Sequence, residues 1–237
     1  SWVESSSSLA LAQSRLPISV RAWAMVSRNC RRTSSTISAA ALTAALTVPG
    51  VDPADYDQAI ALDPQFAGAY NNRGEVHRRQ RRWQVALADY SQAIALDAEL
   101  VPAYHNRGET YAELGELEKA IEDLGKAIAL DPNLLEAING LAWTLATSPV
   151  DVIRNGLMAV GYGEKALSLA GQNEKFLCMD TLATAYAEAG RFTDAVSMQT
   201  KAISLIPDNY DAKESAQFKV RLQSYKEHKS WRDQPER

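Results

Sequence analysis

The chain is poor in the side chains that most often bind metals or act as nucleophiles, with two cysteines and three histidines among 237 residues. Cys30 and Cys178 are far apart and form no disulfide framework, so they neither require nor exclude an oxidising compartment. The sequence has no run of 18 apolar residues, so we expect no membrane span. Alternation with period two never persists, while alanine, leucine and glutamate recur at helical spacing. These patterns predict an all-α protein.

Catalytic patterns are also missing. The histidines are distant from one another and join no cluster with metal-ligand spacing: His77, His105 and His228. Cys178 has no histidine nearby, and Gly161-Tyr162-Gly163 lacks the third glycine and the preceding strand of a phosphate-binding loop. We therefore expect no catalytic residue, no metal, no cofactor and no enzymatic activity.

Basic residues are in the minority, with 25 Lys+Arg against 29 Asp+Glu. Residues 1–53 carry five arginines and two acidic residues, so the rest of the chain is clearly acidic. Nucleic-acid binding needs a basic footprint, so we expect none. Five arginines lie close together in the sequence beside Trp83. They could form a docking patch for an acidic peptide or a phosphate, or they could belong to a solvated helix end. We prefer the second interpretation. The five arginines are Arg73, Arg78, Arg79, Arg81 and Arg82.

One sequence recurs every 34 residues. Residues 55–64 read DYDQAIALDP, 89–98 read DYSQAIALDA and 123–132 read DLGKAIALDP. A fixed period in this range indicates stacked copies of one supersecondary unit. Alanines seven apart leave room for a neighbouring helix, and each copy needs its neighbours to bury its apolar face. These alanines are Ala86, Ala93, Ala120, Ala127, Ala195 and Ala202. The Asp-Pro pairs at 63–64 and 131–132 suit an N-cap and first position of the next helix.

The period, the two helices per copy and the small-residue slots resemble the tetratricopeptide repeat (TPR), with an ending like that of bacterial members. The resemblance implies a right-handed α-solenoid. We expect a half repeat at 51–66, full repeats at 67–100, 101–134 and 176–209, and a capping helix at 210–226 before a tail at 227–237. The copy at 135–175 has 41 residues, and most of the extra ones fall around 148–155, where Pro149 stops a helix.

Residues 1–50 allow three interpretations. They could be a poorly ordered or makeshift cap, with a short helix at 36–47 leading to Asp52 as N-cap and Pro53 as first helical residue. They could contain a weak export signal beginning at Met25. They could also be sequence that is not natively coded. A cytoplasmic location is the preferred expectation, with export as the alternative.

The TPR resemblance implies a groove lined by the first helix of each repeat, in which a peptide or a helix of a protein partner binds. Trp143 is its strongest anchor candidate, unless it packs beneath the 148–155 insertion. The family's carboxylate clamp is matched only at Asn106, so binding of a chaperone tail is not expected. The predicted groove residues are Asn71, Glu75, Arg78, His105, Glu109, Asn139, Trp143, Leu177 and Asp180.

Two hypotheses about function follow. The first is a non-catalytic module that binds a protein or peptide. The second is the repeat arm of a larger enzyme, such as a kinase or glycosyltransferase, whose catalytic part lies outside this chain. The sequence leaves the partner's identity and the oligomeric state open.

Overall fold

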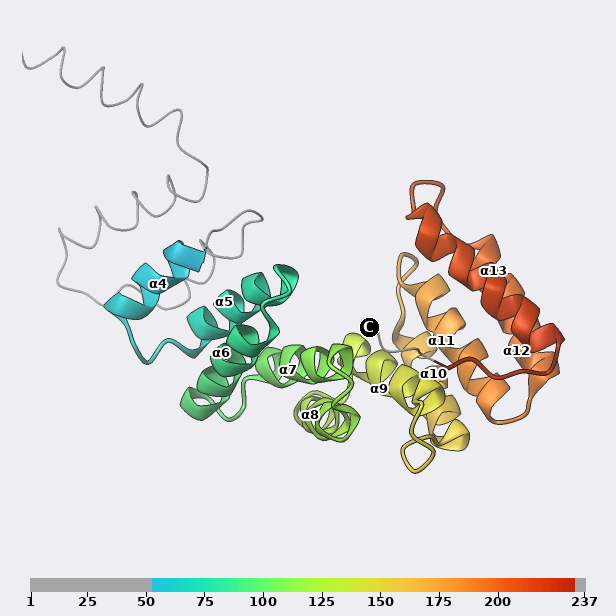
Figure 1. Ribbon diagram of the computed structural model, residues 1–237, viewed down its shortest axis with the longest axis horizontal. Helices are drawn as coiled ribbons and strands as arrows, with labels where there is room; N and C mark the ends of the chain where they lie inside the picture. The colour runs from blue at the N-terminus through green and yellow to red at the C-terminus, as the bar shows by residue number, and fades with distance from the viewer. Residues whose placement is uncertain (1–52, 233–237) are drawn as a thin grey trace, which may run out of the picture. The chain divides into compact units, whose positions relative to one another are not determined.

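The computed structural model describes residues 53–232, and these fall into two compact units, 53–100 and 101–232 (Figure 1). The three interpretations of residues 1–50 concern a segment outside the described residues, as does the end of the predicted tail at 233–237. All regular secondary structure in the described part is helical, as the sequence predicts. The first unit contains α4 (Pro53–Leu62), α5 (Ala67–Arg79) and α6 (Trp83–Leu96). The second contains α7 (Val101–Glu113), α8 (Leu117–Leu130), α9 (Leu135–Thr147), α10 (Gly156–Leu169), α11 (Lys175–Glu188), α12 (Phe192–Ser204) and α13 (Ala212–Lys226).

The helices pack as hairpins, α5 with α6, α7 with α8, α9 with α10 and α11 with α12. In the second unit the first helices of successive hairpins, α7, α9 and α11, also contact one another. The alanines spaced by seven permit this close packing, because all of them are fully buried. The expectation that small residues mark the helix contacts is therefore confirmed.

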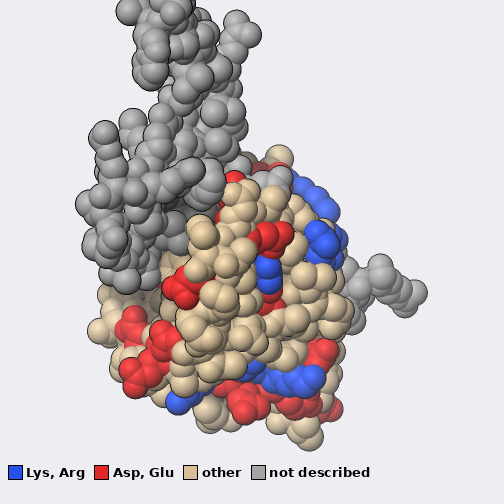
Figure 2. Space-filling model, turned by 90° about the vertical axis from the view of Figure 1, so that its left-hand side faces the viewer, with Lys and Arg blue, Asp and Glu red and all other residues tan. Residues whose placement is uncertain are grey.

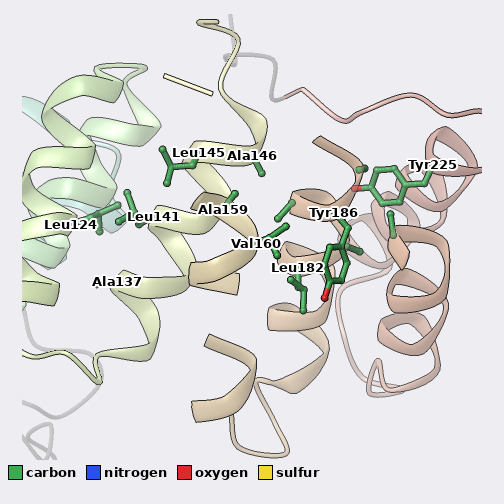
Figure 3. Close-up of a cluster of buried hydrophobic side chains, with 14 of the residues drawn as sticks. Leu124, Ala137, Leu141, Leu145, Ala146, Ala159, Val160, Leu182, Tyr186 and Tyr225 are labelled. Atoms are coloured by element: carbon green, nitrogen blue, oxygen red, sulfur yellow. The ribbon is translucent and has the colours of Figure 1, made fainter. Parts of the chain in front are cut away.

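The main core runs through the second unit, from α8 to α13 (Figure 3). Leu124 of α8 packs with Leu141 of α9, and the same cluster continues through Val160 and Leu182 to Tyr225 of α13. The core is thus divided among hairpins, each of which covers the apolar face of the next. The C-terminal helix belongs to this core and closes its last hairpin.

Two hairpins carry an ion pair at the same repeat position. Arg73 Nε lies 2.9 Å from Asp89 Oδ2, and Arg107 Nε lies 2.6 Å from Asp123 Oδ2. Each arginine contacts its aspartate through a second nitrogen as well, so both pairs are bidentate. The guanidinium groups also lie over the rings of the tyrosines three residues earlier in α5 and α7. These pairs tie the first helix of a hairpin to the second.

The prediction that Asp-Pro pairs start the next helix is wrong. Asp131 is instead the C-cap of α8, and Asp97, which is followed by Ala98, is likewise the C-cap of α6. Their side chains accept hydrogen bonds from the backbone N–H two residues later, as Asp63 does after α4. Short polar side chains favour such a turn, and the hydrogen bond satisfies a backbone N–H group of the loop before the next helix begins.

Helices α5, α7 and α11 end in the same reversal, in which two backbone N–H groups bond back to the last turn. After α7, Gly115 N–H bonds to Ala112 O and Glu116 N–H to Tyr111 O. The equivalent bonds after α5 place Arg81 where the other two helices have glycine. Its φ of 57° is in the left-handed region, where a residue with a Cβ is strained.

Replacing Arg81 with glycine is therefore expected to stabilise the protein by about 1 kcal/mol, because the removed strain outweighs the extra chain entropy of glycine. Urea unfolding of the two proteins measures the difference. Gly115→Arg, at the equivalent position with φ 75°, is the reverse control and should be destabilising. An Arg81→Gly protein less stable than the parent would contradict this account of the turn.

Candidate functional site

Three predicted groove residues lie on α5 in the first unit. Asn71 is buried, and the Glu75 carboxylate accepts hydrogen bonds from Arg78 Nε and Arg79 Nε, both at 2.8 Å. Burial of the Glu75 carboxyl opposes ionisation, but the two arginines outweigh it and lower its pKa. Glu75 and Arg78 thus form a local charge network on one helix.

This network is relevant to the two interpretations of the five arginines between residues 73 and 82. Arg73 contacts Asp57 and Asp89, while Arg78 and Arg79 share Glu75. On the described surface that Figure 2 shows, acidic and basic side chains are interspersed among uncharged ones. Pairing of three arginines with acidic neighbours favours the solvated, internally balanced helix end over a docking patch.

The other six predicted residues lie on α7, α9 and α11 of the second unit, and we call the surface that carries them the first-helix face. On α7, His105 Nε2 lies 3.3 Å from Glu109 Oε1. Burial of the His105 imidazole opposes protonation, but the nearby Glu109 carboxylate outweighs it, so the pKa of His105 is raised. Glu109 remains partly exposed beside it. This end of the face therefore presents a histidine–carboxylate pair.

Asn139 lies on α9 at the repeat position that His105 occupies on α7. Its amide oxygen is buried and accepts no hydrogen bond from the described residues. Buried amide oxygens are normally paired, because an unpaired one costs about 1–3 kcal/mol. The oxygen itself is buried, but the residue is only half-buried, so an outward-turned Asn139 amide could accept from an N–H group of a ligand.

Asp180 of α11 is enclosed by the C-terminal helix. Its Oδ1 accepts from Arg221 Nε at 2.9 Å and from Gln199 Nε2 at 2.5 Å, and its Oδ2 accepts from Arg221 Nη2 at 2.8 Å. The side chains of Asp180 and Arg221 are only 7% and 8% exposed. Asp180 thus anchors α13 to α11.

Trp143 of α9 lies next to the same arginine. The Arg221 guanidinium carbon is 5.4 Å from the Trp143 ring centroid, 4.9 Å from that of Phe218 and 5.7 Å from that of Trp231. The indole is half-buried. Arg221 of α13 therefore lies beside Trp143, where we expected from the sequence either a bound partner or the 148–155 insertion.

The chain turns back over α11 after α13 (Figure 1). His228 adopts φ 57°, with its N–H bonded to Tyr225 O and the next N–H to Ser224 O. Beyond this reversal, Ser230 Oγ donates to Ala187 O at 3.0 Å, and Arg232 Nη1 lies 2.6 Å from Glu188 Oε2. We call residues 230–232 the C-terminal strap.

The 148–155 insertion meets the same end of α11. Arg154 Nε lies 3.1 Å from Glu188 Oε1, and its Nη1 donates to Ser148 O at 2.8 Å. Asn155 caps α10 by accepting from Met158 N–H at 3.0 Å. Glu188 is therefore shared between the insertion and the C-terminal strap.

The remaining candidates show no reactive chemistry. Leu177 is 38% exposed at the start of α11, whereas Cys178 is buried. Burial raises the pKa of the Cys178 thiol to about 11, which disfavours the thiolate. Within residues 53–232 no three His, Cys, Asp or Glu side chains are grouped so that they could hold a metal ion. No helix of that range has both the length and the apolar character for crossing a membrane.

Sequence reasoning missed Arg221 and Trp231 as neighbours of this face. Neither belongs to a repeat, so the 34-residue period carries no signal for them. The Arg–Asp pairs of the first two hairpins were also missed, although both partners recur 34 residues apart. That recurrence was the available signal.

Comparison with known families and structures agrees with the repeat geometry. Family models described as "Tetratricopeptide repeat" match residues 74–155 and 177–206. No curated protein matches the sequence significantly.

Several solved structures have the same fold. The structure described as "YrrB: a TPR protein with an unusual peptide-binding site" is 20% identical, with TM-score 0.57, over 82% of this chain and 97% of that one. TTC0263, a thermophilic TPR protein of Thermus thermophilus, is 19% identical, with TM-score 0.54, over 78% and 91%. A tetratricopeptide repeat protein from Parabacteroides merdae is 18% identical, with TM-score 0.60, over 86% and 74%. At these identities the likeness establishes an all-α helical-repeat solenoid fold.

Proposed function

This chain is a tetratricopeptide repeat protein, and on that premise we propose that it is a non-catalytic interaction module whose first-helix face binds an extended peptide segment of a protein partner. The observation that carries the proposal is the buried Asn139 amide oxygen, which has no hydrogen-bond partner in the described residues. With the half-buried side chain turned outward, it would accept from a backbone N–H of a bound peptide. The description of YrrB as having a peptide-binding site supports the same class of ligand.

The charges at this end of the face favour a peptide with a basic side chain. Glu109 is partly exposed, and Glu136, one turn before Asn139 on α9, is exposed and close enough to raise the pKa of His105. Two carboxylates therefore lie near His105 at the end of the face that carries Asn139. A lysine or arginine of the ligand would lie near them while its backbone bonds to Asn139.

The test begins with selection of peptides from a random 12-residue display library on the full-length chain. Peptides so selected are expected to bind Glu109→Lys at least about tenfold more weakly, a loss of about 1.4 kcal/mol, because the substitution replaces an attractive charge with a repulsive one. Fluorescence anisotropy titrations measure the dissociation constants.

Glu122→Lys is the matched control, since it makes the same charge change at an exposed position of α8, a second helix. It should bind the selected peptides as the parent does. Equal weakening by both substitutions would indicate a general charge effect, and weakening by neither would place binding elsewhere. Either result would contradict the proposal. No observation on the described residues favours the alternative of an enzyme's repeat arm.

A further inference from the structure

We propose that the part of the first-helix face formed by α9 and α11 is a site for a tryptophan–arginine segment, and that the chain's own C-terminal strap is its resident occupant. This inference rests on the proposed function, because it assumes that the face binds extended segments. It adds that a partner for the α9–α11 section has to displace residues 230–232 of this chain.

The contacts of the C-terminal strap resemble those of a bound peptide. It lies beyond the end of α13 and contacts α11 through a side-chain hydrogen bond and an ion pair, while the Trp231 ring lies 5.7 Å from the Arg221 guanidinium carbon of α13. Its three residues are half-buried, whereas the residues 226–229 that lead to it are exposed. The strap is therefore joined to α13 by an exposed turn.

The site is complete without the C-terminal strap. Glu188 would keep its ion pair with Arg154 if Arg232 left, so its carboxylate would not become an isolated charge. Arg221 would keep Asp180 as its partner and Trp143 as its neighbouring ring. Because these groups are paired among themselves, another segment could replace the strap without rebuilding the site.

The chemistry of the site selects its occupant. The Arg221 guanidinium lies near both Trp143 and Trp231, so an aromatic ring of the occupant gains a cation–π contact beside an aromatic neighbour. The Glu188 carboxylate then receives a guanidinium from the next residue. These two contacts select an occupant in which an aromatic residue is followed by arginine.

The turn that leads to the C-terminal strap is compatible with release. His228 has a left-handed backbone that costs free energy for a residue with a Cβ, although its ring stacks on Phe192 at 5.0 Å. The reversal resembles those after α5, α7 and α11, which lead into second helices. Here it leads instead into a segment without regular structure that lies on α11.

The test uses the full-length chain and a fluorescein-labelled peptide of residues 227–237. The variant Trp231→Ala/Arg232→Ala is expected to bind this peptide with a dissociation constant at least about tenfold lower than the parent, because its own strap no longer competes. Adding Glu188→Lys to that variant should remove the gain. Lys226→Ala/Lys229→Ala, which changes two exposed residues beside the strap, is the matched control and should bind as the parent does.

A second measurement needs no destabilising substitution. With 5-fluorotryptophan in the parent protein, excess unlabelled peptide should move the fluorine resonance of Trp231 towards its position in the free peptide. Failure of the double variant to bind better, or a Trp231 resonance that is at the free-peptide position before any addition, would overturn the proposal. If library peptides still bind in a Glu109-dependent manner, the proposed function stands and only the resident-occupant inference falls.

Discussion

Replacing Asp180 with alanine is expected to lower the free energy of unfolding by about 3–5 kcal/mol, because it leaves the buried Arg221 guanidinium without its counter-charge. The carboxylate accepts three hydrogen bonds, two from Arg221 and one from Gln199. These bonds join α11, α12 and α13 at one point. Their loss should loosen the last hairpin and the C-terminal helix together.

Chemical denaturation followed by circular dichroism measures this effect. Asp194→Ala removes the exposed ion pair with Arg191 on α12 and is the matched control, for which only a slight change is expected. Asp180→Leu/Arg221→Met should recover much of the stability lost in Asp180→Ala, because an apolar pair leaves no buried charge unpaired. An Asp180→Ala protein as stable as the parent would show that α13 is not anchored in this way.

Replacing Gly156 with alanine is expected to destabilise the protein by about 3 kcal/mol, at the upper end of ordinary overpacking effects. An added Cβ would lie 2.7 Å from Ala189 N and 2.8 Å from the carbonyl carbon of Glu188. Both atoms belong to the backbone at the end of α11, so no side-chain rotation can relieve the clash. The start of α10 and the end of α11 would have to separate.

Gly161→Ala in the same helix is the matched control. Nothing lies within 4 Å of the Cβ that it adds, so the higher helix propensity of alanine should stabilise α10 by about 1 kcal/mol. Thermal unfolding of the two variants distinguishes close packing from helix propensity. If both substitutions changed the thermal stability equally, close approach of α10 to α11 would not explain why residue 156 is glycine.

The repeat period predicted local structure and missed contacts that are not periodic. Helices α5 to α12 follow from the 34-residue spacing because each repeat position meets an equivalent neighbour, as the buried alanines show. The enclosure of Asp180 depends on Arg221, 41 residues later and outside the repeats. A position-by-position comparison with the family gives Asp180 as part of the groove, but it cannot show what the non-repeating C-terminal residues cover.

The turns illustrate a second limit. Asp followed by Pro is compatible with a helix N-cap, but the same aspartate can bond to the N–H two residues later and close the preceding loop. The structure adopts the second arrangement at residues 63, 97 and 131, where an Asp is followed by either Pro or Ala. The common element is the aspartate, so the proline did not decide the geometry.

That the nine residues line a binding groove remains a prediction, and their local surroundings differ from one another. Asn139, His105 and Glu109 lie where a ligand could complete an unpaired acceptor or meet a carboxylate. Asp180 and Trp143 already contact the chain's own C-terminal part through Arg221. The α7–α9 section is therefore the more direct place to look for a partner, and the α9–α11 section for competition with the strap.

The most direct test is an NMR titration of the isotopically labelled full-length protein with a library-selected peptide. We predict that the largest backbone shift changes fall on α7 and α9, with Glu109 and Asn139 among them. Little change is expected on the second helices α8, α10 and α12. Shift changes concentrated on those second helices would contradict the claim that the first-helix face is the binding surface.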